Sequence, residues 1–291
     1  MTGDALPTRP PAAAAGDQPD ASAASHAAGK PTEYEQAQIA AIAAWKSASP
    51  NLAKRVIRSI TNPLGNLVNK VLPQAAVDSV MDGINKMASQ LAKDDSILKD
   101  SWLQSQGVKS LEEIAAQPLE FADTLADRII SDAEHIALGM GAATGTGGLV
   151  AAAAGLPVMV TGALRVIYRV CQAYGYATDR PRDRLLMLHI LALSTATDAD
   201  ERARAMDNYQ RQIETSFLHA AVEDSAQSAL QRAVLGVELG SVVPGFSIAF
   251  SAYLNRAFVS NAGLAAKRVF QESWLRDHGK VRWIAPDIKQ D

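Results

Sequence analysis

The side chains that could perform acid–base or nucleophilic chemistry are few in this sequence, and they lie far apart. Five histidines and a single cysteine are scattered along 291 residues. Neither the H-E-x-x-H motif of zinc proteases nor the G-x-S-x-G motif of serine hydrolases occurs. We therefore expect no catalytic residue, no resident metal ion and no cofactor. The residues in question are His26, His135, His189, His219, His278 and Cys171.

A hydrolase is the alternative, because catalytic groups can converge from distant positions in a fold. This hypothesis requires Glu134 with His135, or else His189, to line a polar cavity beside a serine or Cys171. His189 lies inside an apolar run, which favours a core position over a catalytic one. Cys171 has apolar neighbours, and we expect its thiol to be buried and inert.

The cysteine count and the N-terminus both bear on where the protein resides. A single cysteine cannot form an intramolecular disulfide, which fits a reducing compartment. The first residues have neither the basic region nor the apolar core of a secretory signal peptide. We therefore expect a cytoplasmic protein, with a peripheral position at the inner face of the cell membrane if its basic residues bind lipid.

Basic residues offer a different chemistry, the binding of anions. No acidic residue occurs between Gln36 and Val77, whereas Lys54, Arg55 and Arg58 cluster beside apolar residues. A basic amphipathic segment is typical of a contact with an anionic membrane surface or a protein partner, although a solvated helix face gives the same pattern. The chain carries 28 Lys and Arg against 31 Asp and Glu, a balance that argues against a nucleic-acid partner.

The stretch from His135 to Tyr176 is rich in glycine and has no charged residue from Ile136 to Leu164. A phosphate-binding loop is not expected, because Thr144 stands where a dinucleotide fingerprint needs its third glycine. The stretch is also weak as a membrane span, since its six strongly apolar residues up to Leu156 gain only about 3 kcal/mol on insertion. We expect a buried core element, and a membrane-inserting protein is the second alternative.

Glycine spacing in this stretch predicts close helix packing. The small-xxx-small pattern lets a neighbouring backbone approach, and two adjacent glycines predict a break in the helix. Pro157 would then open a helix that Gly175 ends as a left-handed cap. A second segment, Val234–Asn255, repeats the spacing, so we expect two Gly/Pro-interrupted apolar hairpins packed at the centre. The predicted helix-packing glycines are Gly141, Gly145, Gly147, Gly148, Gly236 and Gly240.

Helix start signals outline the elements around these hairpins. Thr32-x-x-Glu35 and Ser110-x-x-Glu113 are capping-box patterns, and Pro118 predicts the start of a further helix. Carboxylates are frequent in this part of the chain, and we expect them to form a solvated outer face. They are Glu112, Glu113, Glu120, Asp123, Asp127, Asp132 and Glu134.

The remaining patterns predict the fold class and the domain organisation. Pro181 predicts the start of an apolar helix, and the last helix should end near Gly279. No alternating strand pattern occurs, so we expect an all-α, multi-helix single domain. The boundaries predicted are a disordered Ala/Pro-rich tail over 1–31, a helical domain over 32–279 and a C-terminal tail over 280–291.

Short motifs follow one another at a characteristic spacing. They are GAATGTGG at 141–148, Gly155-Leu156-Pro157 followed by Arg165-x-x-Tyr168, Tyr174-Gly175-Tyr176 before Arg182–Leu193, and VVPGF at 242–246. Their order resembles that of the EcsC protein family, named for a bacterial protein encoded beside an ABC transporter, and the resemblance covers Thr32 to Trp274. Family members often carry an acidic residue just before the proline, where this chain has Gly155 and Leu156, so any role of that carboxylate does not transfer.

The resemblance implies a helical, mainly bacterial protein of a family whose molecular function is not established. Together with the absence of a catalytic motif, it favours a non-catalytic helical protein. Such a protein would act through a protein partner or peripherally at the cytoplasmic membrane, and the family's namesake implies a link to ABC transport or secretion.

Overall fold

Long α-helices make up most of the chain that the structure describes. The computed structural model describes residues 29–48, 86, 90–91, 96–144, 148–178, 181–196, 199–214 and 248–287, and contains no strand within these ranges. The all-α fold expected from the sequence is confirmed. The helices are α1 (Glu33–Ser47), η1 (Ser96–Lys99), α4 (Ser101–Ser105), α5 (Leu111–Ala115), α6 (Leu119–Thr144), α7 (Gly148–Ala173), α8 (Pro181–Thr195), α9 (Ala199–Glu214) and α11 (Ile248–Asp277).

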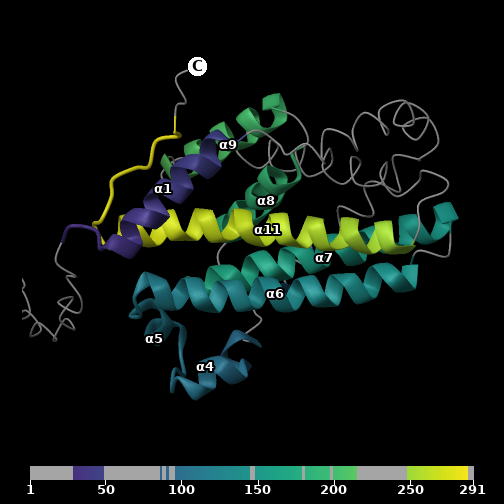
Figure 1. The fold of residues 1–291 in the computed structure, drawn as a ribbon, viewed down its shortest axis with the longest axis horizontal. Helices are drawn as coiled ribbons and strands as arrows, with labels where there is room; N and C mark the ends of the chain where they lie inside the picture. Colours follow the sequence, from purple (N-terminus) through teal and green to yellow (C-terminus); the bar gives the residue numbers. More distant parts are fainter. Residues whose placement is uncertain are drawn as a thin grey trace, which may run out of the picture.

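Helix α11 lies at the centre of the arrangement. It packs against α6, α7, α8 and α1, most extensively against α6, and Figure 1 shows α6, α7 and α11 side by side along the long axis. Ion pairs between Lys267 and Asp127 and between Arg256 and Glu134 show that α6 and α11 run antiparallel, because the residue numbers rise in one helix as they fall in the other. Helices α1, α8 and α9 lie on one side of this layer, and α4 and α5 on the other.

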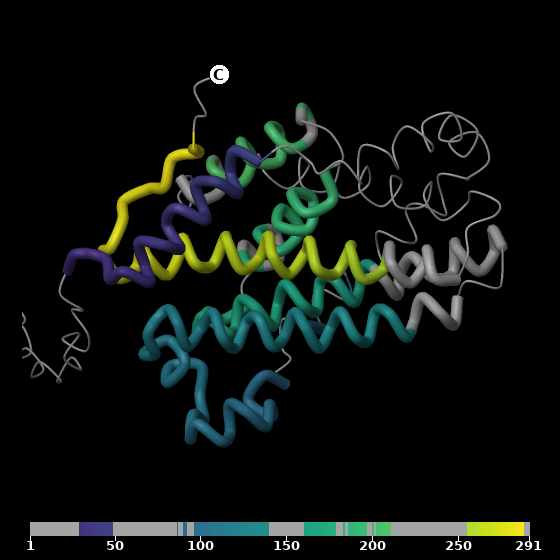
Figure 2. The backbone as a smooth tube through the Cα atoms, viewed as in Figure 1, coloured from purple at the N-terminus to yellow at the C-terminus, as the bar shows by residue number. Residues whose placement is uncertain are grey.

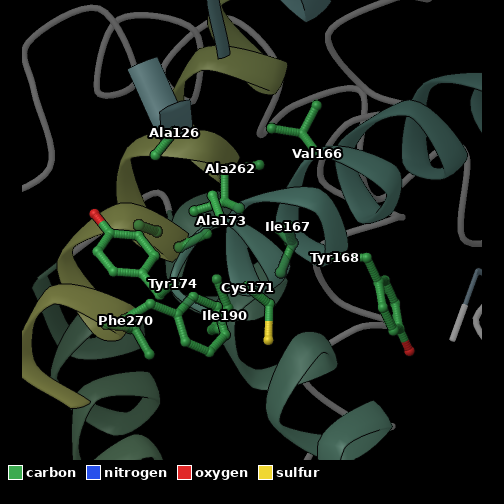
Figure 3. Close-up of a cluster of buried hydrophobic side chains, with 14 of the residues drawn as sticks. Ala126, Val166, Ile167, Tyr168, Cys171, Ala173, Tyr174, Ile190, Ala262 and Phe270 are labelled. Atoms are coloured by element: carbon green, nitrogen blue, oxygen red, sulfur yellow. The ribbon is translucent and has the colours of Figure 1, made fainter. Parts of the chain in front are cut away.

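Small residues bring the central helices together around a buried aromatic pair. Ala126 of α6 and Ala262 of α11 are fully buried, and a Cβ placed on Gly263 would lie 2.6 Å from Cγ1 of Ile130 in α6. Such contacts leave no space for larger side chains. Figure 3 shows the buried cluster, in which the rings of Tyr174 and Phe270 lie with their centroids 6.3 Å apart.

Both predicted capping boxes lie at helix starts. At α1 the box is complete: Thr32 Oγ1 accepts from the amide of Glu35 at 3.2 Å, and Glu35 Oε2 accepts from the amide of Thr32 at 2.7 Å. At α5 only half of it forms. Ser110 Oγ accepts from the amide of Glu113, whereas the Glu113 carboxylate accepts from the amide of Lys109 instead.

The predicted left-handed cap at Gly175 is confirmed. Its φ is +79°, its amide donates to the carbonyl of Gln172 at 2.9 Å, and the next amide, that of Tyr176, donates to the carbonyl of Cys171 at 3.3 Å. This pair of bonds is the Schellman motif. A Cβ on Gly175 would also lie 2.5 Å from Cα of Ala115, so both the backbone angle and the contact with α5 require glycine here. The predicted end of α11 near Gly279 is likewise confirmed.

The predicted helix start at Pro157 is wrong. Helix α7 begins at Gly148, so Pro157 lies inside it, although a proline there removes one backbone hydrogen bond. Burial of the later part of α7 against α6, α8 and α11 outweighs that cost. The break predicted at Gly147-Gly148 stays a prediction, because residues 145–147 lie outside the described ranges.

Several predictions fall outside the described residues. They include the second hairpin, of which only the part from Ile248 is described, as the start of α11. Gly141 lies in α6 and Gly148 begins α7, but their role in helix packing stays a prediction. Within the described ranges, no helix combines the length and the apolar content needed to cross a bilayer. The predicted residues outside these ranges are Lys54, Arg55, Arg58, Gly145, Gly147, Gly236 and Gly240.

Replacing Gly175 with alanine should destabilise the protein more than the same change at Gly107. Both glycines have positive φ, +79° and +78°, which costs alanine about 1–2 kcal/mol. Only at Gly175 does the added Cβ also collide with the Ala115 backbone, which adds about 1–3 kcal/mol of overpacking, because nothing lies within 4 Å at Gly107. Urea denaturation of both variants measures the difference, and equal losses would contradict this account of Gly175.

Candidate functional site

A buried carboxylate, Asp123 of α6, lies where the long helices meet. Its side chain is 1% exposed and accepts hydrogen bonds from the hydroxyls of Tyr34 (2.7 Å) and Tyr174 (2.5 Å) and from Nε2 of Gln271 (2.8 Å). These donors come from α1, from the residue that follows α7 and from α11. The expectation of a solvated Asp123 is therefore wrong. At helical spacing Asp123 shares the apolar face of Leu119, and that periodicity was the available signal.

The surroundings of Asp123 keep both phenols protonated. Burial is the first cause that raises the pKa of Tyr34 and Tyr174, and the negative charge of Asp123 raises both further. The chain of bonds continues through Gln271, whose Oε1 accepts from Arg268 at 2.7 Å. Asp123 is thus fully engaged with neighbouring helices, and its chemistry serves the fold.

A buried ion pair joins Lys46 of α1 to Glu272 of α11. The two side chains are 0% and 1% exposed, with Nζ 2.7 Å from each carboxylate oxygen. Nζ also donates to the carbonyl of Ile284 at 2.7 Å, and the Ile284 amide donates back to Glu272 at 3.2 Å. The segment after α11, which the sequence places in the C-terminal tail, is thereby fixed against α1, and Figure 2 shows the two running together.

Lys46 has little capacity left for a substrate. Burial lowers its pKa, while the charge of Glu272 and their hydrogen bond act in the opposite direction. An ammonium group has three N–H donors, and three acceptor atoms lie within 2.7 Å of this one. The pair is therefore a closed contact, and a free nucleophilic amine is not expected here.

A pocket of about 420 Å³ opens beside this ion pair. Its volume lies in the range of small-molecule sites, about 300–1,000 Å³. Trp283 is 48% exposed, and one face of its ring lies over Nζ of Lys46 at 5.2 Å from the centroid. The lining contains three cationic side chains and one carboxylate, an arrangement suited to an anion. The lining residues are Lys46, Tyr209, Gln210, Glu272, Arg276, Arg282 and Trp283.

The residues that the hydrolase hypothesis requires lie elsewhere. Glu134 pairs with Arg256 of α11 at 2.9 Å, and His135 is exposed on α6. His189 is buried in α8, and Cys171 is buried in α7 as predicted, where burial raises the pKa of its thiol and keeps it neutral. None of the four lines the pocket. Within the described ranges no group of His, Cys, Asp and Glu is arranged to hold a metal ion.

The sequence alone did not identify the pocket, because its residues are far apart in the chain. Lys46 and Glu272 are separated by 226 positions. Arg282 and Trp283 follow the last helix, in a stretch without periodicity. The one local signal was the adjacent Arg282 and Trp283, because arginine often binds phosphate groups and tryptophan is enriched at membrane interfaces.

Removing one member of the buried ion pair should cost more stability than removing both. Lys46→Met leaves Glu272 as an uncompensated buried charge, an expected loss of about 3–5 kcal/mol. The double variant Lys46→Met/Glu272→Leu should lose less than either single variant. Lys267→Met, which breaks the pair with the 63%-exposed Asp127, should cost below about 1 kcal/mol. Urea denaturation of Lys46→Met, Glu272→Leu, the double variant and Lys267→Met measures these losses of stability. Losses that simply add in the double variant would argue against coupling of Lys46 and Glu272.

Stability should fall as the pH rises above about 10, partly because of Tyr174. The folded-state pKa of this buried phenol is raised above its ordinary value of 10.0, so in this range the unfolded chain releases a proton that the folded chain retains. Stability is therefore fully present below pH 10 and is lost above it, at up to about 1.4 kcal/mol per pH unit for one group. Tyr174→Phe should lose about 1–3 kcal/mol at pH 7 and show a shallower alkaline decline. Parallel declines in the two proteins would refute the assignment.

Comparison with known proteins agrees with the resemblance seen in the motifs. The family model described as the EcsC protein family matches residues 36–275. "Uncharacterized protein YdbA" of Bacillus subtilis (strain 168) is 25% identical over 160 residues, a match that spans 53% of this chain and 58% of that relative. No solved structure gives a significant match. Because the family model covers most of its length, the chain belongs to the EcsC protein family.

Proposed function

We propose that this chain is a non-catalytic helical protein that binds peripherally to the anionic surface of the cytoplasmic membrane. The observation that carries the proposal is the exposed Trp283 beside Arg276 and Arg282 at the pocket. We call Gln210, Arg276, Arg282 and Trp283 the pocket rim.

The buried polar residues support a non-catalytic role. Asp123 accepts hydrogen bonds from three helical neighbours, and Lys46 and Glu272 are engaged with each other and with Ile284. Each of these side chains is nearly inaccessible to solvent. Groups used in this way stabilise one arrangement of helices, and a substrate could engage them only by breaking these contacts.

The charges at the pocket rim support binding to an anionic surface. Lys46 neutralises Glu272, so the two rim arginines supply the excess positive charge. Each basic residue near an anionic bilayer contributes about 1 kcal/mol of attraction. Tryptophan favours the interface between lipid and water, and Trp283 has almost half of its surface available for that contact.

The proposal extends to the basic segment predicted from the sequence. Lys54, Arg55 and Arg58 follow α1 in the chain and would add to the same attraction. A protein partner with an acidic surface is the alternative occupant of the pocket rim, and the assay below separates it from lipid. A link to ABC transport or secretion rests on family membership alone.

Vesicle flotation tests the membrane proposal. The protein should float with phosphatidylcholine vesicles that contain phosphatidylglycerol, should stay behind with pure phosphatidylcholine, and should be released by salt. Arg276→Gln/Arg282→Gln should weaken binding about 30-fold, which is two contributions of about 1 kcal/mol. Arg256→Gln/Lys267→Gln is the matched control, because it removes the same charge from the part of α11 that faces α6.

The outcome of flotation also decides between the two basic regions. A loss of binding in Lys54→Gln/Arg55→Gln/Arg58→Gln, with full binding by the rim variant, would place the membrane contact in the predicted segment. No flotation on anionic vesicles by the native protein would refute the membrane proposal and leave a protein partner.

A further inference from the structure

We infer that the pocket binds a single phosphate monoester, carried either by a lipid headgroup or by a small soluble molecule. The inference rests on the proposed function in one respect, the use of the pocket rim to bind an anion, and it names the chemical group that the rim recognises.

The floor of the pocket is electrically neutral, and its edge is positive. Lys46 and Glu272 form a closed pair, so a ligand meets the charges of Arg276 and Arg282. Within the described part of the chain neither arginine has an ion-pair partner, and both guanidinium groups are available. Their combined charge of about +2 matches the −1.5 to −2 of a phosphate monoester near pH 7.

Arg276 lies close to the floor as well as to the edge. Burial is the main cause that lowers the pKa of Lys46, and the positive charge of Arg276 adds to it. Burial raises the pKa of Tyr209, and Arg276 acts in the opposite direction there. Arg276 lines the pocket together with Lys46 and Tyr209. Because Lys46 and Glu272 are already paired, a bound anion would lie with the arginines at the mouth of the pocket, above the ion pair.

The donor chemistry of the two arginines favours phosphate over a carboxylate. A guanidinium group presents paired N–H donors that match two oxygens of one phosphate, and two arginines can engage three or four oxygens. One carboxylate has two oxygens and a charge of −1, so it matches the charge of two arginines less well than a phosphate monoester does. Gln210 adds an amide group at the same rim.

The pocket has room for more than the phosphate. A phosphate group takes up the space of a few water molecules, about 30 Å³ each. The volume of the pocket, about 420 Å³, is larger than that. One face of the Trp283 ring is covered by Lys46, while the side chain remains 48% exposed. The group esterified to the phosphate, such as a glycerol or sugar, would therefore pack against Trp283.

Calorimetric titration of the full chain with inorganic phosphate and with glycerol 3-phosphate tests the inference. We expect saturable binding at one site, with glycerol 3-phosphate the tighter ligand, and an affinity about tenfold lower in Arg276→Gln and in Arg282→Gln. Arg276→Lys keeps the charge but loses the paired donors, and should bind more weakly than the native protein. Lys267→Gln should bind normally, and urea denaturation should show that each variant is folded.

Two vesicle arms identify the source of the phosphate. Preferential flotation with phosphatidic acid, a monoester, over phosphatidylglycerol at equal surface charge, competed by inorganic phosphate, assigns the site to a lipid headgroup. Binding of glycerol 3-phosphate without a preference for phosphatidic acid assigns it to a soluble ligand.

Failure of the inference is distinguishable from failure of the proposed function. If neither soluble probe binds, or the arginine variants bind them as well as the native protein, the phosphate site is refuted even where the protein still floats on anionic vesicles. If the probes bind but no vesicle does, the pocket assignment stands and the membrane proposal fails.

Discussion

The arrangement of the long helices depends on the buried carboxylate of Asp123. A carboxylate removed from water is stable only when hydrogen-bond donors replace the lost solvent, and three separate segments supply them. Apolar packing alone tolerates small changes in rotation and register between helices. Asp123 removes that freedom, because Tyr34, Tyr174 and Gln271 must all reach one point. The close approach of Gly263 to Ile130 fits the register that results.

A second buried contact, the ion pair of Lys46 and Glu272, involves the next residue of α11. Gln271 reaches Asp123, and Glu272, the next residue, reaches Lys46. Helix α1 is thereby held near its start by Tyr34 and at its end by Lys46. The segment that follows α11 depends on the same pair, since both backbone groups of Ile284 bond to it. Together with the pair of Lys280 and Glu35 and the bond from the Asp287 amide to the Ala43 carbonyl, it holds the segment that carries Arg282 and Trp283 against α1.

Local features of the fold could be predicted from the sequence, and long-range features could not. The caps at Thr32 and Gly175 depend on residues within one or two helical turns, so their patterns were sufficient. The helix start predicted at Pro157 is wrong because helix propensity is a local property, whereas the burial of α7 depends on the whole fold. The many acidic residues around Asp123 predict a solvated position for it. Its place four residues after the buried Leu119, on the same helix face, predicts the buried position that the structure has. The pocket joins residues from both ends of the chain, which no local pattern connects.

The pocket separates the charge that stabilises the fold from the charge left for a ligand. An anion that reached Lys46 would compete with Glu272 and leave a buried carboxylate unpaired, at a cost of several kcal/mol. The rim arginines carry no such cost, because a ligand there exchanges water for phosphate oxygens without breaking an ion pair. The ligand should therefore stay at the mouth of the pocket, with its attached group against Trp283.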